Sequence, residues 1–87
     1  MRIIEIKNIT RKDVPLYYRM HYSGIAVLEL VNRNIDCCID FSVETKPTGV
    51  KEISITKVDV VDYPLIPLKK ELKQFIGALD SGGGLPV

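Results

Sequence analysis

Alternation of apolar and polar residues with a period of two is the feature that most limits how this chain can fold. It is clearest over residues 35–44, where Ile35, Cys37, Ile39, Phe41 and Val43 occupy every second position. Successive side chains of a strand point to opposite faces, so this pattern indicates a strand with one buried face. Period-two alternation dominates residues 2 to 60, and only the last part of the chain changes to helical spacing.

Turn-forming residues divide the alternating region into about five predicted strands. These strands cover residues 2–9, 15–22, 25–31, 35–44 and 50–60. Ser23 and Gly24 favour a two-residue hairpin turn, because glycine readily adopts a positive φ. A change of phase from Ile55 to Val58 predicts a bulge near Lys57.

A helical stripe follows the strands. Its apolar members are Leu68, Leu72, Phe75, Ile76 and Leu79. Pro67 suits the first helical position, and no good N-cap residue precedes it. The prediction is an α+β fold, with an antiparallel, meander-like sheet of about five strands and one C-terminal amphipathic helix packed on one face. A small, partly closed β-barrel is the alternative. Residues 1–80 form a single domain in this interpretation, and residues 81–87 form a flexible, glycine-rich tail.

The length and composition restrict the class of protein. The chain has 87 residues, a length that suits one small domain and excludes a multidomain enzyme. Its formal net charge is +1. No apolar run is long enough for a membrane helix, and charges at Arg2 and Glu5 come too early for a secretory signal. We therefore expect a cytoplasmic protein that does not contact a membrane.

The chemistry-bearing residues form no predicted catalytic or metal-binding group. Cys37 and Cys38 are adjacent, so on a strand they point to opposite faces and cannot form an unstrained disulfide. His21 is the only histidine, and the predicted register separates it from Cys38 by two strands. Asp36 and Asp40 lie four positions apart on one strand, a separation of roughly 13 Å. We expect no enzymatic activity, no metal and no cofactor.

The sheet face opposite the helix is the candidate interaction surface. Pairing the predicted hairpins places an apolar centre between a basic, aromatic margin and an acidic margin on this face. The predicted interface residues are Tyr17, Arg19, His21, Ala26, Leu28, Leu30, Asp36 and Asp40. In the alternative arrangement, the first strand or the loop at residues 10–14 covers this face within one chain.

The distribution of charge along the chain agrees with a basic margin and an acidic margin. Residues 1–24 contain five basic and two acidic side chains, whereas residues 25–62 contain four basic and seven acidic ones. A two-fold axis through the apolar centre would set the basic margin of one copy against the acidic margin of another. We therefore expect a noncatalytic protein-interaction module that forms a homodimer or binds a larger protein. Its size suits an assembly component or an inhibitor encoded by a phage or mobile element.

Binding of single-stranded nucleic acid is the alternative function. Arg11, Lys12, Tyr17 and Arg19 interleave cations with an aromatic ring that could stack on an unpaired base. A net charge of +1 and the seven carboxylates of residues 25–62 argue against it, because backbone recognition usually needs a basic domain.

Overall fold

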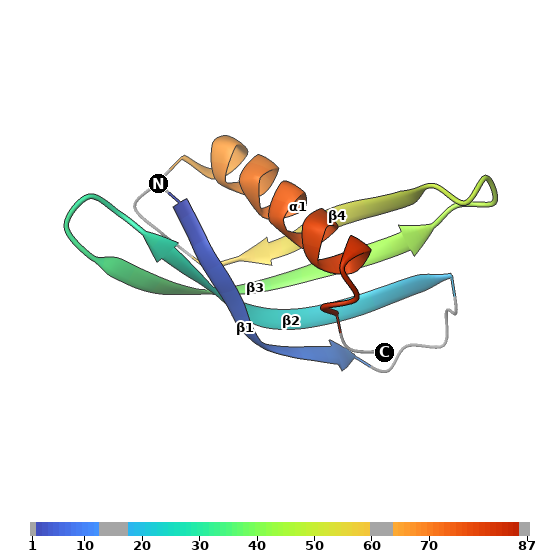
Figure 1. The fold of residues 1–87 in the computed structure, drawn as a ribbon, viewed down its shortest axis with the longest axis horizontal. Helices are drawn as coiled ribbons and strands as arrows, with labels where there is room; N and C mark the ends of the chain where they lie inside the picture. Colours follow the sequence, from blue (N-terminus) through green and yellow to red (C-terminus); the bar gives the residue numbers. More distant parts are fainter. Residues whose placement is uncertain (1, 13–17, 60–63, 86–87) are drawn as a thin grey trace.

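The structure is a computed structural model that describes residues 2–12, 18–59 and 64–85. Within these ranges it contains the strands β1 (Arg2–Lys12), β2 (Arg19–Glu29), β3 (Asn34–Thr45) and β4 (Lys51–Val58) and the helix α1 (Leu65–Ser81). The strands form one open antiparallel sheet in the order β1-β2-β3-β4, and α1 lies across one face (Figure 1). The α+β class, the meander order and the helix on one face are confirmed, and the four described strands do not close into the alternative barrel.

The prediction of five strands was wrong at Ser23 and Gly24. β2 runs through both residues without a turn, and it pairs with β1 on one side and with β3 on the other. Gly24 permits a close approach there: a Cβ atom at this position would lie 3.0 Å from Cγ2 of Ile6 and 3.4 Å from Cγ1 of Ile9. The glycine therefore accommodates β1 packing in mid-strand, which is the other common reason for a glycine within a strand.

The continuous β2 reverses the faces assigned to its residues after Gly24. Side chains of directly opposite residues share a face, and Leu28 lies opposite Ile35 and Ala26 opposite Cys37. Since Ile35 and Cys37 belong to the apolar set of β3, Ala26 and Leu28 face α1 rather than away from it. We call the face that contacts α1 the inner face and the opposite one the outer face. Ile25 and Val27 lie on the outer face.

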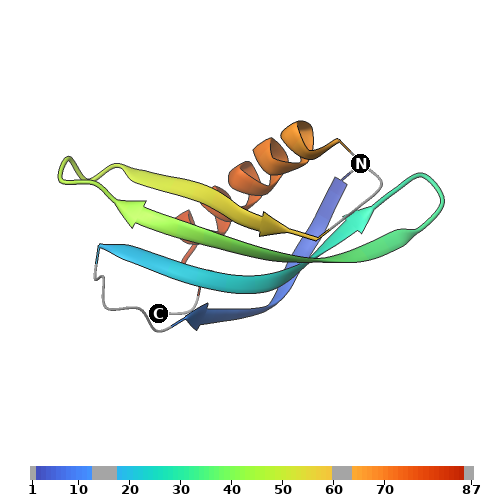
Figure 2. The ribbon, with the colours of Figure 1, turned by 180° about the vertical axis from the view of Figure 1, so that it is seen from behind.

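Two irregularities bend β1. The register with β2 shifts between Ile3 and Glu5 and again between Lys7 and Thr10, and Asn8 has a φ of 55° in the second irregularity. Both views show the first half of β1 curving toward the side of the sheet that carries α1 (Figures 1 and 2). The first strand therefore borders the helix and does not cover the outer face. Residues 13 and 14 of the predicted covering loop lie outside the described residues.

β4 and α1 agree with most of their predicted features. The register passes from Lys57 opposite Asp40 to Ile55 opposite Phe41, which confirms the bulge near Lys57 and leaves Thr56 as the additional residue. The helix begins at Leu65, two residues before the predicted start, so Pro67 is the third helical residue. No side chain caps its N-terminus.

The core lies between the inner face and the helix. Leu68, Leu72 and Ile76 of α1 are fully buried against apolar side chains of the sheet. After Ser81 the chain turns through glycines, with Gly83 at a φ of 73°, and Leu85 packs into the same core at 9% exposure. The predicted tail is thus in contact with the domain at Leu85. A flexible tail stays a prediction, and residues 86–87 lie outside the described part of the chain.

Candidate protein-interaction surfaces

The outer face is the predicted interaction surface, and charged side chains occupy most of it. Arg19, His21, Asp36 and Asp40 lie on this face, as predicted. The full set, from the strand registers, is Arg2, Glu5, Lys7, Thr10, Lys12, Arg19, His21, Ser23, Ile25, Val27, Glu29, Asn34, Asp36, Cys38, Asp40, Ser42, Glu44, Glu52, Ser54 and Lys57.

Ion pairs within one chain join the basic and acidic sides of this face. Lys7 of β1 reaches across β2 to Asp36 of β3 at 3.3 Å, and Lys12 reaches in the same way to Asp40 at 3.1 Å. Arg19 of β2 contacts its direct neighbour Glu44 at 2.5 Å. The cations and carboxylates that were expected to meet between two copies therefore already meet within one copy.

Hydrogen bonds change the acidity of two of these groups. The hydroxyl of Ser23 donates to Asp40 at 2.7 Å, and this bond together with the contact from Lys12 lowers the pKa of the Asp40 carboxyl below its usual value. The hydrogen bond and charge of Glu44 raise the pKa of Arg19. Among the described residues, Nε of Arg19 is buried without a hydrogen-bond partner. Asp40 and Arg19 are consequently charged groups that already have partners within the same chain.

The apolar centre of the outer face differs from the predicted one. Ile25 and Val27 form it in the structure, and the sequence prediction had placed both residues on the helix side. Ala26 and Leu28, predicted for this centre, have 0% exposure beneath α1. Leu30 lies after β2, in the turn where its amide donates to the carbonyl of Arg33, and Tyr17 lies outside the described residues. The partly buried Ile25 and Val27 take the place predicted for Ala26 and Leu28. The missed signal is Gly24, which allows the strand to continue.

The two cysteines occupy different environments on opposite faces. Cys37 is buried at 2% exposure, and burial raises the pKa of its thiol. Cys38 is exposed opposite Ile25, whereas His21 lies opposite Ser42, four positions further along β3 and roughly 13 Å away. Within the described ranges, no group of three or more histidine, cysteine, aspartate or glutamate residues could hold a metal ion.

The basic residues proposed for nucleic acid do not form one surface. Lys12 and Arg19 on the outer face are paired with carboxylates, at Asp40 and Glu44. Arg11 lies opposite Tyr22 on the inner face and lines a cavity there. The fourth residue, Tyr17, falls outside the described ranges. A nucleic acid chain would have to displace two intramolecular ion pairs to reach these cations.

The open edge of β4 is a second candidate surface. Among the described residues, no strand pairs with β4 on the side away from β3. The amide of Lys46 donates to the carbonyl of Val50, and bonded pairs alternate in an antiparallel ladder. The backbone groups of Glu52 and Ser54 therefore bond to β3, and those of Lys51, Ile53 and Ile55 point outward. We call residues 51–55 the edge segment.

This architecture defines a small α+β domain with an open antiparallel sheet covered on one face by a C-terminal helix. The chain belongs to the Bb0187 family, whose sequence profile matches residues 1–81. No curated protein and no solved structure matches the chain. In the part of the chain that the structure describes, no helix is long and apolar enough to span a membrane.

Proposed function

We propose that this domain is a noncatalytic protein-interaction module that pairs with a second copy of itself through the edge segment of β4. The observation that carries the proposal is that the edge segment contains no bulge and has outward backbone groups at alternate residues. Unpaired strand edges are templates for pairing with another chain, and sheet extension is a common mode of protein recognition. A location in the cytoplasm, and a role as an assembly component or an inhibitor encoded by a phage or mobile element, belong to the same proposal.

The two edges of the sheet differ in how well they could accept another strand. β1 is bent by two irregularities and carries charges at alternating and adjacent positions, features that protect an edge from pairing. The edge segment is regular, and its charges are compensated: Lys51 pairs with Asp80 at 2.9 Å and Glu52 with Lys46 at 2.6 Å. β4 is therefore the edge that favours association.

The sequence of the edge segment suits an antiparallel pairing centred on Ile53. In that register, Lys51 lies opposite Ile55 of the partner subunit and Glu52 lies opposite Ser54 of the partner subunit, so no like charges meet. A register centred on Lys51 would oppose two lysines, and one centred on Ile55 would cross the bulge at Thr56. The Ile53-centred pairing has a closed two-fold symmetry, which limits assembly to dimers.

Exposed apolar side chains lie at both ends of this edge. Val50 precedes the edge segment at 60% exposure, and Leu65 and Ile66 begin α1 at 49% and 85%. The N-terminal half of α1 extends past β4 (Figure 2). A two-fold axis at Ile53 would direct this half toward the β3–β4 turn of the partner subunit, which carries the exposed valine. The same pairing would therefore bury apolar surface besides forming hydrogen bonds.

The expected affinity is moderate. The pairing would form about six backbone hydrogen bonds, each with a net contribution of about 1 kcal/mol. Association costs on the order of 4 to 15 kcal/mol in lost freedom, so apolar burial must supply the remainder. We expect a reversible dimer with a dissociation constant between about 1 and 100 μM.

Two substitutions of opposite charge at Ser54 should change the dissociation constant of the dimer in opposite directions. Ser54 lies on the outer face of the edge segment, opposite Glu52 of the partner subunit in the proposed register. Ser54→Glu would place two like-charge pairs across the interface and Ser54→Lys two opposite-charge pairs, each worth about 0.2 to 1 kcal/mol. Sedimentation equilibrium should give a dissociation constant about 2- to 30-fold larger for Ser54→Glu and smaller by a similar factor for Ser54→Lys.

Two control variants separate this surface from the alternatives. Thr10→Glu adds the same charge on β1, far from the edge segment, and should leave the dissociation constant unchanged. Val27→Lys disrupts the apolar centre of the outer face, and loss of the dimer in this variant would assign the interface to that face instead. A wild-type chain that stays monomeric at 1 mM (roughly the weak limit for specific association), or equal effects of both Ser54 variants, would refute edge pairing.

A further inference from the structure

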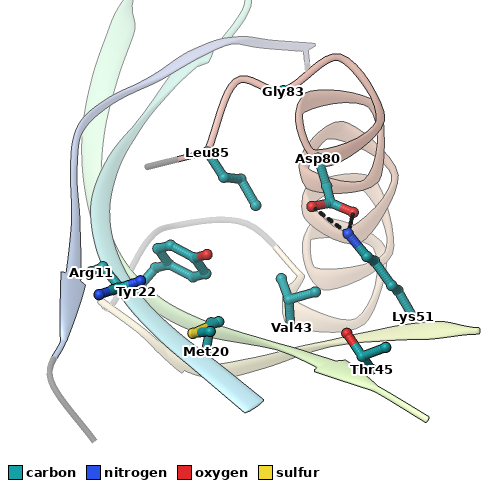
Figure 3. A pocket seen from close by; sticks show the side chains of 9 residues that line it. All are labelled: Arg11, Met20, Tyr22, Val43, Thr45, Lys51, Asp80, Gly83 and Leu85. Carbon is teal, nitrogen blue, oxygen red and sulfur yellow. Dashed lines mark hydrogen bonds and ion pairs between the residues drawn. The ribbon is translucent and has the colours of Figure 1, made fainter. Parts of the chain in front are cut away.

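A cavity of about 350 Å³ opens at the end of the sheet where β1 ends and β2 begins. Residues of all four strands, of the end of α1 and of the segment after it line the cavity (Figure 3). The lining residues are Arg11, Met20, Tyr22, Val43, Thr45, Lys51, Asp80, Gly83 and Leu85. The cavity lies on the inner face, so it is separate from the outer face. It shares one residue with the edge segment: Lys51 lines the cavity, while its backbone groups belong to the outward groups of that segment.

The floor of the cavity is apolar. Met20, Val43 and Leu85 contribute aliphatic or thioether side chains, and Figure 3 shows Leu85 pointing toward Val43 and the ring of Tyr22. The Tyr22 ring is held by stacking on Phe41, with 5.2 Å between ring centroids. This floor would exclude water from the hydrocarbon part of a ligand, as is usual for small-molecule sites.

The charges at the rim are unequal. The ammonium of Lys51 contacts both carboxylate oxygens of Asp80, at 2.9 and 3.1 Å, so this pair is nearly neutral as a unit. No carboxylate of the described residues lies within ion-pair distance of Arg11, although Arg2, Lys7, Lys12 and Arg19 all have such partners. Among the described residues that line the rim, Arg11 is therefore the cation without a carboxylate partner.

These walls select the charge and shape of a ligand. A guanidinium matches a carboxylate with two parallel hydrogen bonds. A phosphate monoester would bring a second negative charge close to Asp80, and the lining residues that the structure describes offer it no second cation without a carboxylate partner. The apolar floor favours a hydrocarbon body over a sugar. We propose that the cavity binds a small amphipathic monocarboxylate, with its carboxylate on Arg11 and its hydrocarbon chain on Met20, Val43 and Leu85.

Octanoate is a suitable probe, because its chain is short enough for a cavity of this size. Octanoate has about ten non-hydrogen atoms, and a binding free energy of about 0.4 to 0.55 kcal/mol per atom, well below the ceiling for small ligands, corresponds to a dissociation constant of about 0.1 to 1 mM. Titration of the full chain with octanoate, followed by NMR, should shift the amides around Met20, Val43 and Leu85. Octanol, which lacks the charge, and acetate, which lacks the chain, should each bind at least about ten-fold more weakly.

Variants at Arg11 test the assignment of the anchor. Arg11→Gln should weaken octanoate binding about ten-fold or more, and Arg11→Lys should have an intermediate effect because it keeps the charge without the planar fork. Arg2→Gln removes a cation at the opposite end of β1 and should have no effect. Arg11 is exposed, and an unchanged amide spectrum of the variants without ligand verifies the fold.

Three outcomes would overturn the proposal: no amide shifts up to about 10 mM octanoate, a concentration well above the expected range; equal affinity in wild type and Arg11→Gln; or shifts confined to another surface. The dimer proposed above does not use Arg11. A loss of octanoate binding without a change in sedimentation therefore concerns the cavity alone.

Discussion

Truncation of Leu28 tests whether β2 runs through Gly24 without a turn, which decides the face of the sheet on which Leu28 lies. Leu28 has 0% exposure and lies in one core cluster with Leu68 and Leu72 of α1. Leu28→Ala removes three carbons, worth about 2.4 kcal/mol of transfer free energy at 0.8 kcal/mol each. The remaining cavity adds to this, and measured costs for buried leucines range from about 2.7 to 5 kcal/mol. We expect a loss near 4 kcal/mol (roughly the middle of that range), a large fraction of the stability of a small domain.

The neighbouring residue on the other face is the matched control. Val27 is partly buried on the outer face and is outside the core cluster, so Val27→Ala should cost about 1 kcal/mol or less. Leu28→Met, which nearly conserves volume, should cost less than about 1.5 kcal/mol and stay folded even if Leu28→Ala does not. Urea unfolding at one protein concentration, followed by circular dichroism, gives the three free energies. An equal or larger cost for Val27→Ala than for Leu28→Ala would refute the continuous β2 and the face assignment that depends on it.

Two further substitutions probe local features. Gly24→Ala should destabilise the domain by about 1 to 3 kcal/mol in urea unfolding, since the new Cβ would lie 3.0 Å from Cγ2 of Ile6; a neutral or stabilising effect would contradict the close approach of β1. Asp40 has a lowered pKa in the folded state, so its stabilising contribution is complete above its unfolded pKa and is lost as the pH falls through the lower folded pKa. Asp40→Asn should therefore flatten the acid limb of the stability profile, and an unchanged slope below about pH 5 would contradict the role assigned to its hydrogen bonds.

The candidate surfaces were only partly predictable from the residues. Asp36 and Asp40 follow directly from the alternation of β3, which has one apolar and one polar set of positions. The ion pairs that neutralise them depend on Lys7 and Lys12, which are distant in the chain; Lys12 and Asp40 are 28 positions apart. Local patterns contain no information on such partners, so the charges were assigned to a contact between copies.

The residues by themselves determined the α+β class, the strand around Phe41, the bulge near Lys57 and the amphipathic helix, because each depends on a periodicity or a local backbone preference. Tertiary structure decided the path of β2. Both of its faces carry apolar residues, so alternation alone does not distinguish a turn at Gly24 from a strand that continues through it. Packing of Ile6 against the glycine, and pairing with two neighbouring strands, settles that choice. Without a turn at Ser23 and Gly24, the residues of β2 after Gly24 point to the opposite face from the predicted one, and Leu28 moves from the surface to the core.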